Sequence, residues 1–271
     1  MLFIAIVIYN KKSEDIASKK SIQKLREQYD LDHVRVIIID NSDRNIKSEN
    51  KFISDEGIAY IKNNKNLGLS KAYNKAVNYA KHISKDFTND FILFLDDDTE
   101  VPYEYLDKIY KTAEIEAHSS NHINIITGMV TSGTVPMSPT KGYRFRYKAS
   151  DYITKPGIYE DITFINSGTA IRLDSILKVN GFNEELFLDM IDYTMAYELM
   201  RHGLCRVNVI NYKITQSFSG RTKVDKRVLI RRYHIYKKDF EKYCEITGRS
   251  KMFCRMALLK RRFMIELKSG R

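Results

Sequence analysis

Short apolar segments that alternate with polar, helix-compatible ones most constrain how this chain can fold. Leu2–Ile8, Val34–Ile39, Ile58–Ile61 and Phe91–Leu95 are runs rich in Ile, Val, Leu and Phe, the pattern of strands buried on both faces of a sheet. A helix is expected over 70–83, between the third and fourth runs. This alternation predicts an α/β fold with a mostly parallel central sheet flanked by helices.

Polar residues follow three of these expected strands. They are Tyr9-Asn10, Asp40-Asn41 and the triplet Asp96–Asp98. In parallel sheets, ligands bind in the crevice beyond the carboxyl ends of the strands. We therefore expect the three clusters to meet at one site.

The acidic triplet is the sharpest of these signals. Alternate residues at a strand end point to the same side, so Asp96 and Asp98 can face one ligand while Asp97 faces away. Two convergent carboxylates suit a hard divalent cation bound together with substrate phosphates. An acidic loop that caps the next helix is the alternative. A phosphatase of the haloacid-dehalogenase type also begins with strand-Asp-x-Asp, but it requires Thr where this chain has Glu100.

Two further segments point to an anionic, nucleotide-like ligand. Asp40 can accept hydrogen bonds from a ribose or a base edge, with an Asx-turn that closes the strand as the alternative. Gly68 and a helix with Ser70 as its N-cap follow in the stretch 64–74. Helix N-termini attract anions and Lys71 adds a positive charge, although an ordinary capped helix has the same sequence features.

Taken in order, these motifs resemble family 2 glycosyltransferases of the GT-A fold, and most closely the rhamnosyltransferase-like branch of bacterial surface polysaccharide synthesis. The resemblance covers roughly residues 1–220. Its motifs are Tyr9-Asn10, Asp40-Asn41-Ser42, Asn66-x-Gly68…Asn74, Phe94–Thr99, Phe164–Thr169 and Gly181–Asp192.

The resemblance implies an inverting glycosyltransferase that uses Mn²⁺ or Mg²⁺. It moves a sugar from a UDP- or dTDP-sugar donor to a growing surface polysaccharide or a lipid-linked glycan. Asp98, with Asp96, would hold the metal. The residues expected to bind the nucleotide sugar are Tyr9, Asn10, Asp40, Asn66, Gly68, Lys71, Asp96 and Asp97.

The resemblance also places a catalytic carboxylate at the start of a late helix. An inverting displacement needs a general base that takes the proton of the acceptor hydroxyl. The candidates are Asp189 and Asp192, three residues apart and so expected on one face of a helix from about Asp189 to Arg201. The family's acidic motif favours Asp192. First-turn carboxylates stabilised by the helix dipole are the alternative.

Two departures from the family pattern keep other functions open. Gln216 stands where many relatives have a His that contributes to the metal site, and Glu198 lies near the place of a usual basic residue. A nucleotidyl- or phosphotransferase that uses the same Asp pair is one alternative. An inactive sugar-nucleotide-binding subunit is the other.

The net charge of +11 is concentrated at one end of the chain. Residues 221–271 hold 17 of the 45 Lys and Arg but only 5 of the 34 Asp and Glu, so the preceding 220 residues are almost neutral. This asymmetry argues against a nucleic-acid-binding body. We expect a catalytic domain over 1–220, with a nucleotide-sugar half (about 1–101) and an acceptor half (about 102–220). A basic helical extension over 221–271 would follow it.

Apolar residues recur among the basic ones of this extension at helical spacing. Two stripes are expected, Val228, Leu229, Tyr233, Tyr236 and Phe240, and Met252, Phe253, Met256, Leu259 and Phe263. A basic amphipathic helix is typical of membrane-surface binding. Packing on the body or in a homodimer is the alternative. Three cysteines and no apolar run of membrane-spanning length predict a cytoplasmic protein, peripheral at the inner face of the cell membrane if the extension binds lipid.

Overall fold

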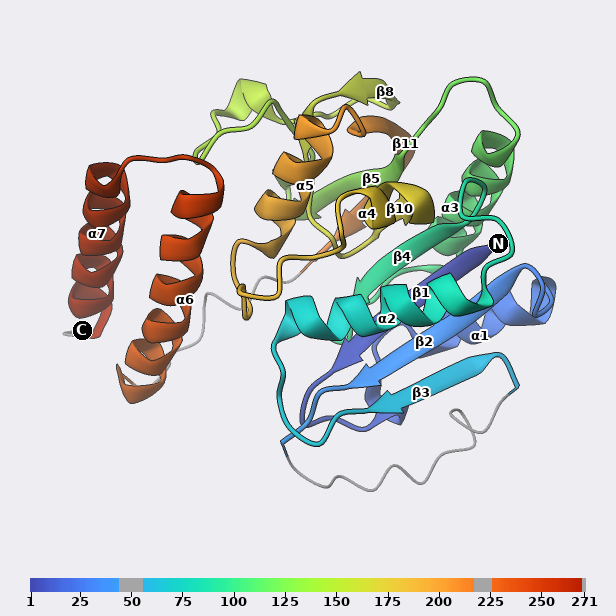
Figure 1. Ribbon diagram of the computed structural model, residues 1–271, viewed down its shortest axis with the longest axis horizontal. Helices are drawn as coiled ribbons and strands as arrows, with labels where there is room; N and C mark the ends of the chain where they lie inside the picture. The colour runs from blue at the N-terminus through green and yellow to red at the C-terminus, as the bar shows by residue number, and fades with distance from the viewer. Residues whose placement is uncertain (44–55, 217–225, 270–271) are drawn as a thin grey trace.

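A nine-stranded sheet forms the centre of the computed structural model, which describes residues 1–43, 56–216 and 226–269 (Figure 1). Its strands are β1 (Leu2–Ile8), β2 (Val34–Asp40), β3 (Ile58–Lys62), β4 (Phe91–Asp96), β5 (Ile125–Ser132), β6 (Val135–Ser138), β8 (Gly157–Glu160), β10 (Thr169–Arg172) and β11 (Arg206–Thr215). They follow in the order β3-β2-β1-β4-β10-β5-β11-β8, with β6 beside β5. Only β6, β8 and β10 run antiparallel to their neighbours, which confirms a mostly parallel sheet.

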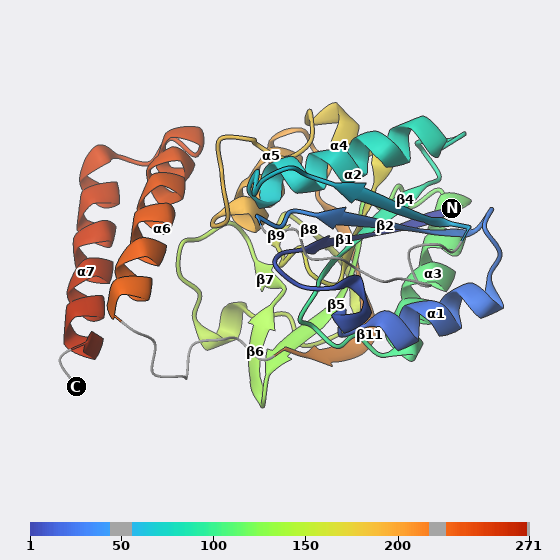
Figure 2. The same ribbon diagram turned by 90° about the horizontal axis from the view of Figure 1, so that it is seen from below.

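Helices cover both faces of this sheet. Alternate residues of β1 enter different cores: Phe3 and Ala5 pack with α2, α4 and α5, whereas Leu2 and Ile4 pack with α1 and α3. Figure 2 shows α2 and α4 on one side of the sheet and α1 on the other. The helices are η1 (Ser13–Asp15), α1 (Lys19–Gln28), α2 (Leu69–Ile83), α3 (Tyr103–Ala117), η2 (Ala149–Asp151), α4 (Leu173–Lys178), α5 (Ile191–Arg201), α6 (Lys226–Ile246) and α7 (Lys251–Ser269). Two short strands, β7 (Thr140–Lys141) and β9 (Ile162–Thr163), form a separate sheet.

Two element boundaries near the site differ from the prediction. The helix expected from about Asp189 begins only at Ile191, because Met190 takes a left-handed φ of 62°. Asp189 therefore lies outside the helix, and the prediction that Asp189 and Asp192 share one helical face is wrong. Gly68, and not Ser70, occupies the N-cap position of α2.

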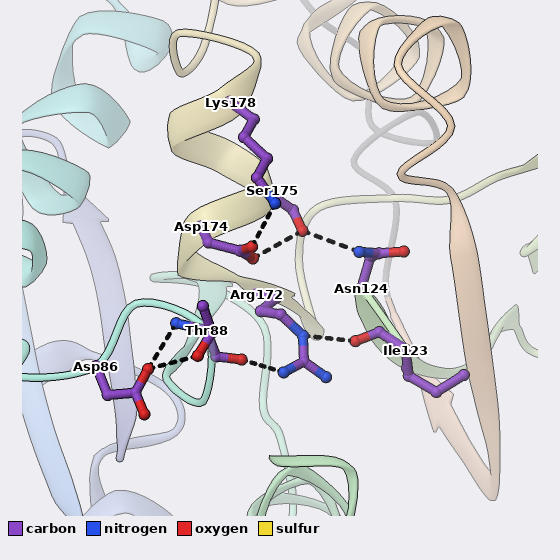
Figure 3. Close-up of polar contacts among 8 residues, drawn as sticks. All are labelled: Asp86, Thr88, Ile123, Asn124, Arg172, Asp174, Ser175 and Lys178. Atoms are coloured by element: carbon purple, nitrogen blue, oxygen red, sulfur yellow. Dashed lines mark hydrogen bonds and ion pairs between the residues drawn. The ribbon is translucent and has the colours of Figure 1, made fainter. Parts of the chain in front are cut away.

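Buried Arg172 closes the end of the sheet opposite the polar strand ends (Figure 3). Its Nε donates to the carbonyl oxygen of Ile123 at 2.7 Å and its Nη2 to that of Glu116 at 3.1 Å, while Nη1 donates to the carbonyl oxygen of Thr88. One cation thereby connects the loop before β4, the end of α3 and the loop before β5. These hydrogen bonds stabilise the packing of three separate segments at this end of the sheet.

Within the basic extension, residues 226–269 fold into a hairpin of α6 and α7 that packs on one end of the body (Figure 1). Tyr236, Phe240 and Tyr243 of α6 are buried against Tyr143 and Phe145, from the loop that follows β7. The expected helices are confirmed over 226–269, and α6 packs within the molecule. The predicted boundary at residue 220 lies outside the described residues. In the described part of the chain, no helix has the length and apolarity needed to cross a membrane.

Candidate active site

A cavity of about 680 Å³ lies beyond the carboxyl ends of β1 and β4. Its walls come from these strand ends, the start of α2, the loops before β10 and α5, and α6. The sequence-predicted residues that line it are Tyr9, Asn66, Gly68, Asp96, Asp97, Asp98, Asp189 and Asp192. Segments that are far apart in the sequence thus meet at one site.

The acidic triplet forms one wall of this cavity. Asp98 is exposed and Asp96 is half-buried, with its backbone N–H donating to Ser167 Oγ at 3.0 Å. Burial, and then the negative charge of Asp98, raise the pKa of Asp96 to about 6. Asp97 is held differently, because Lys11 Nζ lies 3.3 Å from its Oδ1.

These oxygen ligands fit Mg²⁺ or Mn²⁺ in chemical type but supply only a part of a coordination shell. Within the described residues, no group of three or more His, Cys, Asp or Glu could hold a metal ion. Mg²⁺ is typically bound by one or two carboxylates together with substrate phosphates and water. Asp98 and Asp96 would be those carboxylates, and a bound cation would offset the negative charge of Asp98 that adds to the effect of burial on the pKa of Asp96.

Asp192 lines the same cavity as the triplet and lies in the first turn of α5. Burial is the main cause that raises its pKa to about 7, and the carboxylate of Asp96 adds to the effect. A backbone hydrogen bond from Asn166 partly opposes the increase. A carboxyl group with a pKa near the working pH is well suited to general base catalysis.

Asp189 has a different environment from Asp192. Arg232 of α6 donates from Nη2 to Asp189 Oδ1 at 2.8 Å and from Nη1 to Asp189 Oδ2. Both carboxylate oxygens are thereby occupied in a bidentate ion pair. The geometry favours Asp192 over Asp189 as the proton acceptor.

The start of α2 is fixed by a residue that the sequence analysis left without a role. Buried Asn41 donates from Nδ2 to Asn66 Oδ1 at 2.9 Å and to the carbonyl oxygen of Gly68 at 3.3 Å, and its Oδ1 accepts from the N–H of Leu67 at 2.9 Å. Gly68 has a φ of +85°, and a Cβ there would lie 2.8 Å from the carbonyl oxygen of Phe187. This turn therefore requires glycine.

Membership of a family follows from comparison with known sequences. The model of the family described as "Glycosyl transferase family 2" matches residues 3–178, well over half of the chain. The chain belongs to glycosyltransferase family 2. It is 24% identical over 208 residues to the dTDP-rhamnosyl transferase RfbF of Shigella flexneri, an alignment that covers 75% of this chain and 64% of that protein.

Solved structures of other glycosyltransferases share the fold. The mannosyltransferase PcManGT from Pyrobaculum calidifontis, in complex with GDP-Man and Mn²⁺, matches with a TM-score of 0.53 at 13% identity, over 90% of this chain and 64% of that one. GalNAc-T7 with UDP, GalNAc and Mn²⁺ gives a TM-score of 0.55 at 13% identity, over 92% and 51% of the two chains. The expected GT-A fold is confirmed.

Three predicted donor-binding residues of this family 2 chain lie outside the cavity lining. Asp40 is 2% exposed, and its oxygens accept from the N–H of Ser42 at 3.0 Å and from Tyr60 OH at 2.5 Å. The bond to Ser42 is the Asx-turn that its sequence allowed. Asn10 donates from its backbone N–H to Ser42 Oγ. Lys71 is exposed and lines a separate hollow with Glu184 and Glu185.

Two buried amides complete the cavity wall. Asn166 is 1% exposed and Gln216 is 5% exposed. Among the residues that the structure describes, neither Oδ1 nor Nδ2 of Asn166, nor Nε2 of Gln216, has a hydrogen-bond partner. Because buried polar groups are normally paired, these atoms are candidates for ligand contacts. The Asn-Ser-Gly motif at 166–168 marked Asn166 in the sequence, but only the fold shows that Asn166 lines the cavity.

Proposed function

We propose that this protein is an inverting, metal-dependent glycosyltransferase that moves a sugar from a UDP- or dTDP-sugar to a growing surface polysaccharide or a lipid-linked glycan. The observation that carries the proposal is that the Asp96–Asp98 carboxylates line one cavity together with Asp192, whose pKa is raised to about 7. The acidic triplet suits a metal-bound diphosphate, and Asp192 suits deprotonation of an attacking hydroxyl.

The donor's diphosphate would lie beside Asp98 in this cavity. A bound Mn²⁺ or Mg²⁺ would neutralise charge on the departing diphosphate. Asp192 takes the proton of the acceptor hydroxyl while the oxygen of that hydroxyl bonds to the anomeric carbon. The bond from that carbon to the diphosphate oxygen breaks, and the configuration inverts.

The relatives support a nucleotide sugar as the donor, but they differ in the nucleotide and in the sugar. RfbF is named a dTDP-rhamnosyl transferase, PcManGT is solved with GDP-Man and GalNAc-T7 with UDP. A dTDP-sugar has the support of sequence similarity, and a UDP-sugar that of the fold alone. Both belong in the test.

Incubation with a panel of UDP- and dTDP-sugars, Mn²⁺ and a glycan acceptor tests the proposal through the products. Release of a nucleoside diphosphate with growth of the acceptor supports sugar transfer. Release of pyrophosphate would instead indicate a nucleotidyltransferase. Donor binding without turnover would indicate an inactive binding subunit.

We also propose that α7 places the enzyme on an anionic lipid surface, where a lipid-linked acceptor would lie. Six of the fourteen large apolar side chains that are exposed in the described structure belong to α7. Five of them form one helical face: Met252, Met256, Leu259, Phe263 and Leu267. Lys251, Arg255 and Lys260 stand among them, which favours an anionic bilayer over a second copy of the same basic helix.

Co-sedimentation with phosphatidylglycerol vesicles and with phosphatidylcholine vesicles tests this placement. Binding to the anionic vesicles alone is expected, with loss of binding in Leu259→Gln. Ile115→Gln is the matched control, because Ile115 is 68% exposed on α3 and Leu259 67% exposed on α7. A dimer in solution that Leu259→Gln dissociates, without vesicle binding, would overturn the proposal.

A further inference from the structure

One face of α6 contacts the segment 185–189, of which residues 187–189 line the active-site cavity. Arg232, Asp239 and Lys242 recur on this face at intervals of seven and three residues, and each contacts the segment 185–189. We infer that α6 is part of the catalytic site and that Asp239 is the positioning residue that holds this segment in place. The inference rests on the proposed function for its effect on turnover.

Asp239 is completely buried and accepts hydrogen bonds from three consecutive backbone N–H groups. Its Oδ1 accepts from Phe187 at 2.9 Å, and its Oδ2 accepts from Leu188 and Asp189, each at 2.8 Å. Hydrogen bonds to an ionised acceptor are about twice as strong as neutral ones. Because a single carboxylate takes all three donors, the path of the backbone from 187 to 189 is fixed relative to α6.

Two ion pairs flank this anchor. The bidentate pair of Arg232 with Asp189 lies on one side, and on the other Lys242 Nζ lies 2.6 Å from Glu185 Oε2. Contacts with α6 therefore reach both ends of the segment 185–189. Asp239 itself does not line the cavity, so it acts through the segment that it holds.

The segment connects α6 to the donor side of the cavity. The carbonyl oxygen of Phe187 accepts from the N–H of Leu69 at 2.6 Å, and Phe187 lies against Gly68. Phe187, Leu188 and Asp189 all line the cavity. Release of the segment from Asp239 would therefore disturb the start of α2 and Asp189 together.

Asp239→Asn tests the inference. Both carboxylate oxygens of Asp239 accept hydrogen bonds, and the substitution replaces one of them with an NH2 group, which cannot accept the hydrogen bond of the backbone N–H that it faces. Hydrogen–deuterium exchange of the amides of 187–189 is expected to become at least about tenfold faster, while the amides of β1 and β4 keep their protection. The KM for the donor should rise, and the melting temperature should fall by a few degrees, because a buried N–H loses its acceptor. Glu241→Gln is the matched control, since it removes one exposed charge from the same helix and should change none of these values.

Asp239→Glu keeps both acceptor oxygens and should recover part of the protection, and it provides the comparison should Asp239→Asn not fold. Unchanged exchange at 187–189 in Asp239→Asn would overturn the inference, as would faster exchange throughout the sheet. Exchange is read without turnover. A wild-type protein that transfers no sugar would therefore contradict the proposed function and leave this test intact.

Discussion

Arg232 holds the carboxylate of Asp189 in a bidentate ion pair, with Nη2 2.8 Å from Oδ1. The two residues are 43 positions apart, and the pair joins α6 to the loop before α5. It also distinguishes the two carboxylates that the sequence offers as candidates for the general base, of which the family's acidic motif favours Asp192. Asp189 is engaged by a cation, whereas burial and the charge of Asp96 raise the pKa of Asp192.

The rate of sugar transfer should depend on the protonation of Asp192. Its pKa is raised to about 7, so the group is protonated and unable to act as a base well below that pH. We expect kcat to increase as the pH rises through about 7 and to level off above it. A pH profile measured at saturating donor and Mn²⁺ checks this. A flat profile between pH 5 and pH 9 would contradict the assignment.

Turnover should require a divalent metal ion, and Asp98 should be the main protein ligand of that ion. EDTA is expected to abolish turnover and added Mn²⁺ to restore it. Asp98→Asn should increase the Mn²⁺ concentration for half-maximal activity at least about tenfold, because a metal ligand is lost. Asp97→Asn, whose parent side chain pairs with Lys11, should change this concentration much less. Equal effects of the two substitutions would count against Asp98.

Gly68→Ala should damage the start of α2. An alanine at a φ of +85° is strained by about 1–2 kcal/mol, and its Cβ would lie 2.8 Å from the carbonyl oxygen of Phe187. Overpacking adds about 1–3 kcal/mol, and the donor KM should rise. Gly133→Ala, at a φ of +59° with open space around it, carries only the conformational strain. Denaturant unfolding and donor titration of both variants would reveal equal losses if the contact with Phe187 had no effect.

Arg172 should stabilise the fold without a role in turnover. Arg172→Met removes three hydrogen bonds to buried or partly buried carbonyl groups and should lower the free energy of unfolding by about 3 kcal/mol or more. Lys178→Met, which breaks only an exposed ion pair with Asp174, should cost less than about 1 kcal/mol. Urea unfolding measures both losses, and similar values would contradict this role of Arg172.

The sheet and the acidic wall of the site could be predicted because their signals are local. A buried parallel strand is a continuous apolar run, and the polar residues that follow it mark the ligand-binding edge. β1, β2, β3 and β4 accordingly lie within one residue of the predicted runs, and Asp96–Asp98 line the cavity.

The contribution of α6 could not be predicted because it depends on contacts that span some 50 residues. Asp239 looks in the sequence like one acidic residue in a basic amphipathic helix, yet it is buried against three backbone N–H groups. Asp40 shows the same dependence on packing, because its strand-end position gave no sign that Tyr60 on the neighbouring strand would donate a hydrogen bond to its carboxylate. Local pattern identifies candidates, and the packing of distant segments decides among them.

The most direct test of the account is the rate of nucleoside diphosphate release by Asp192→Asn and Asp189→Asn, measured side by side with the wild-type protein at saturating Mn²⁺. If Asp192 is the general base, Asp192→Asn should lower kcat by about 10²–10⁴-fold and leave donor binding intact. Asp189→Asn should lower it by less than about tenfold, as expected when one partner of an ion pair is neutralised. Wild-type turnover in Asp192→Asn, or a larger loss in Asp189→Asn, would contradict the central claim.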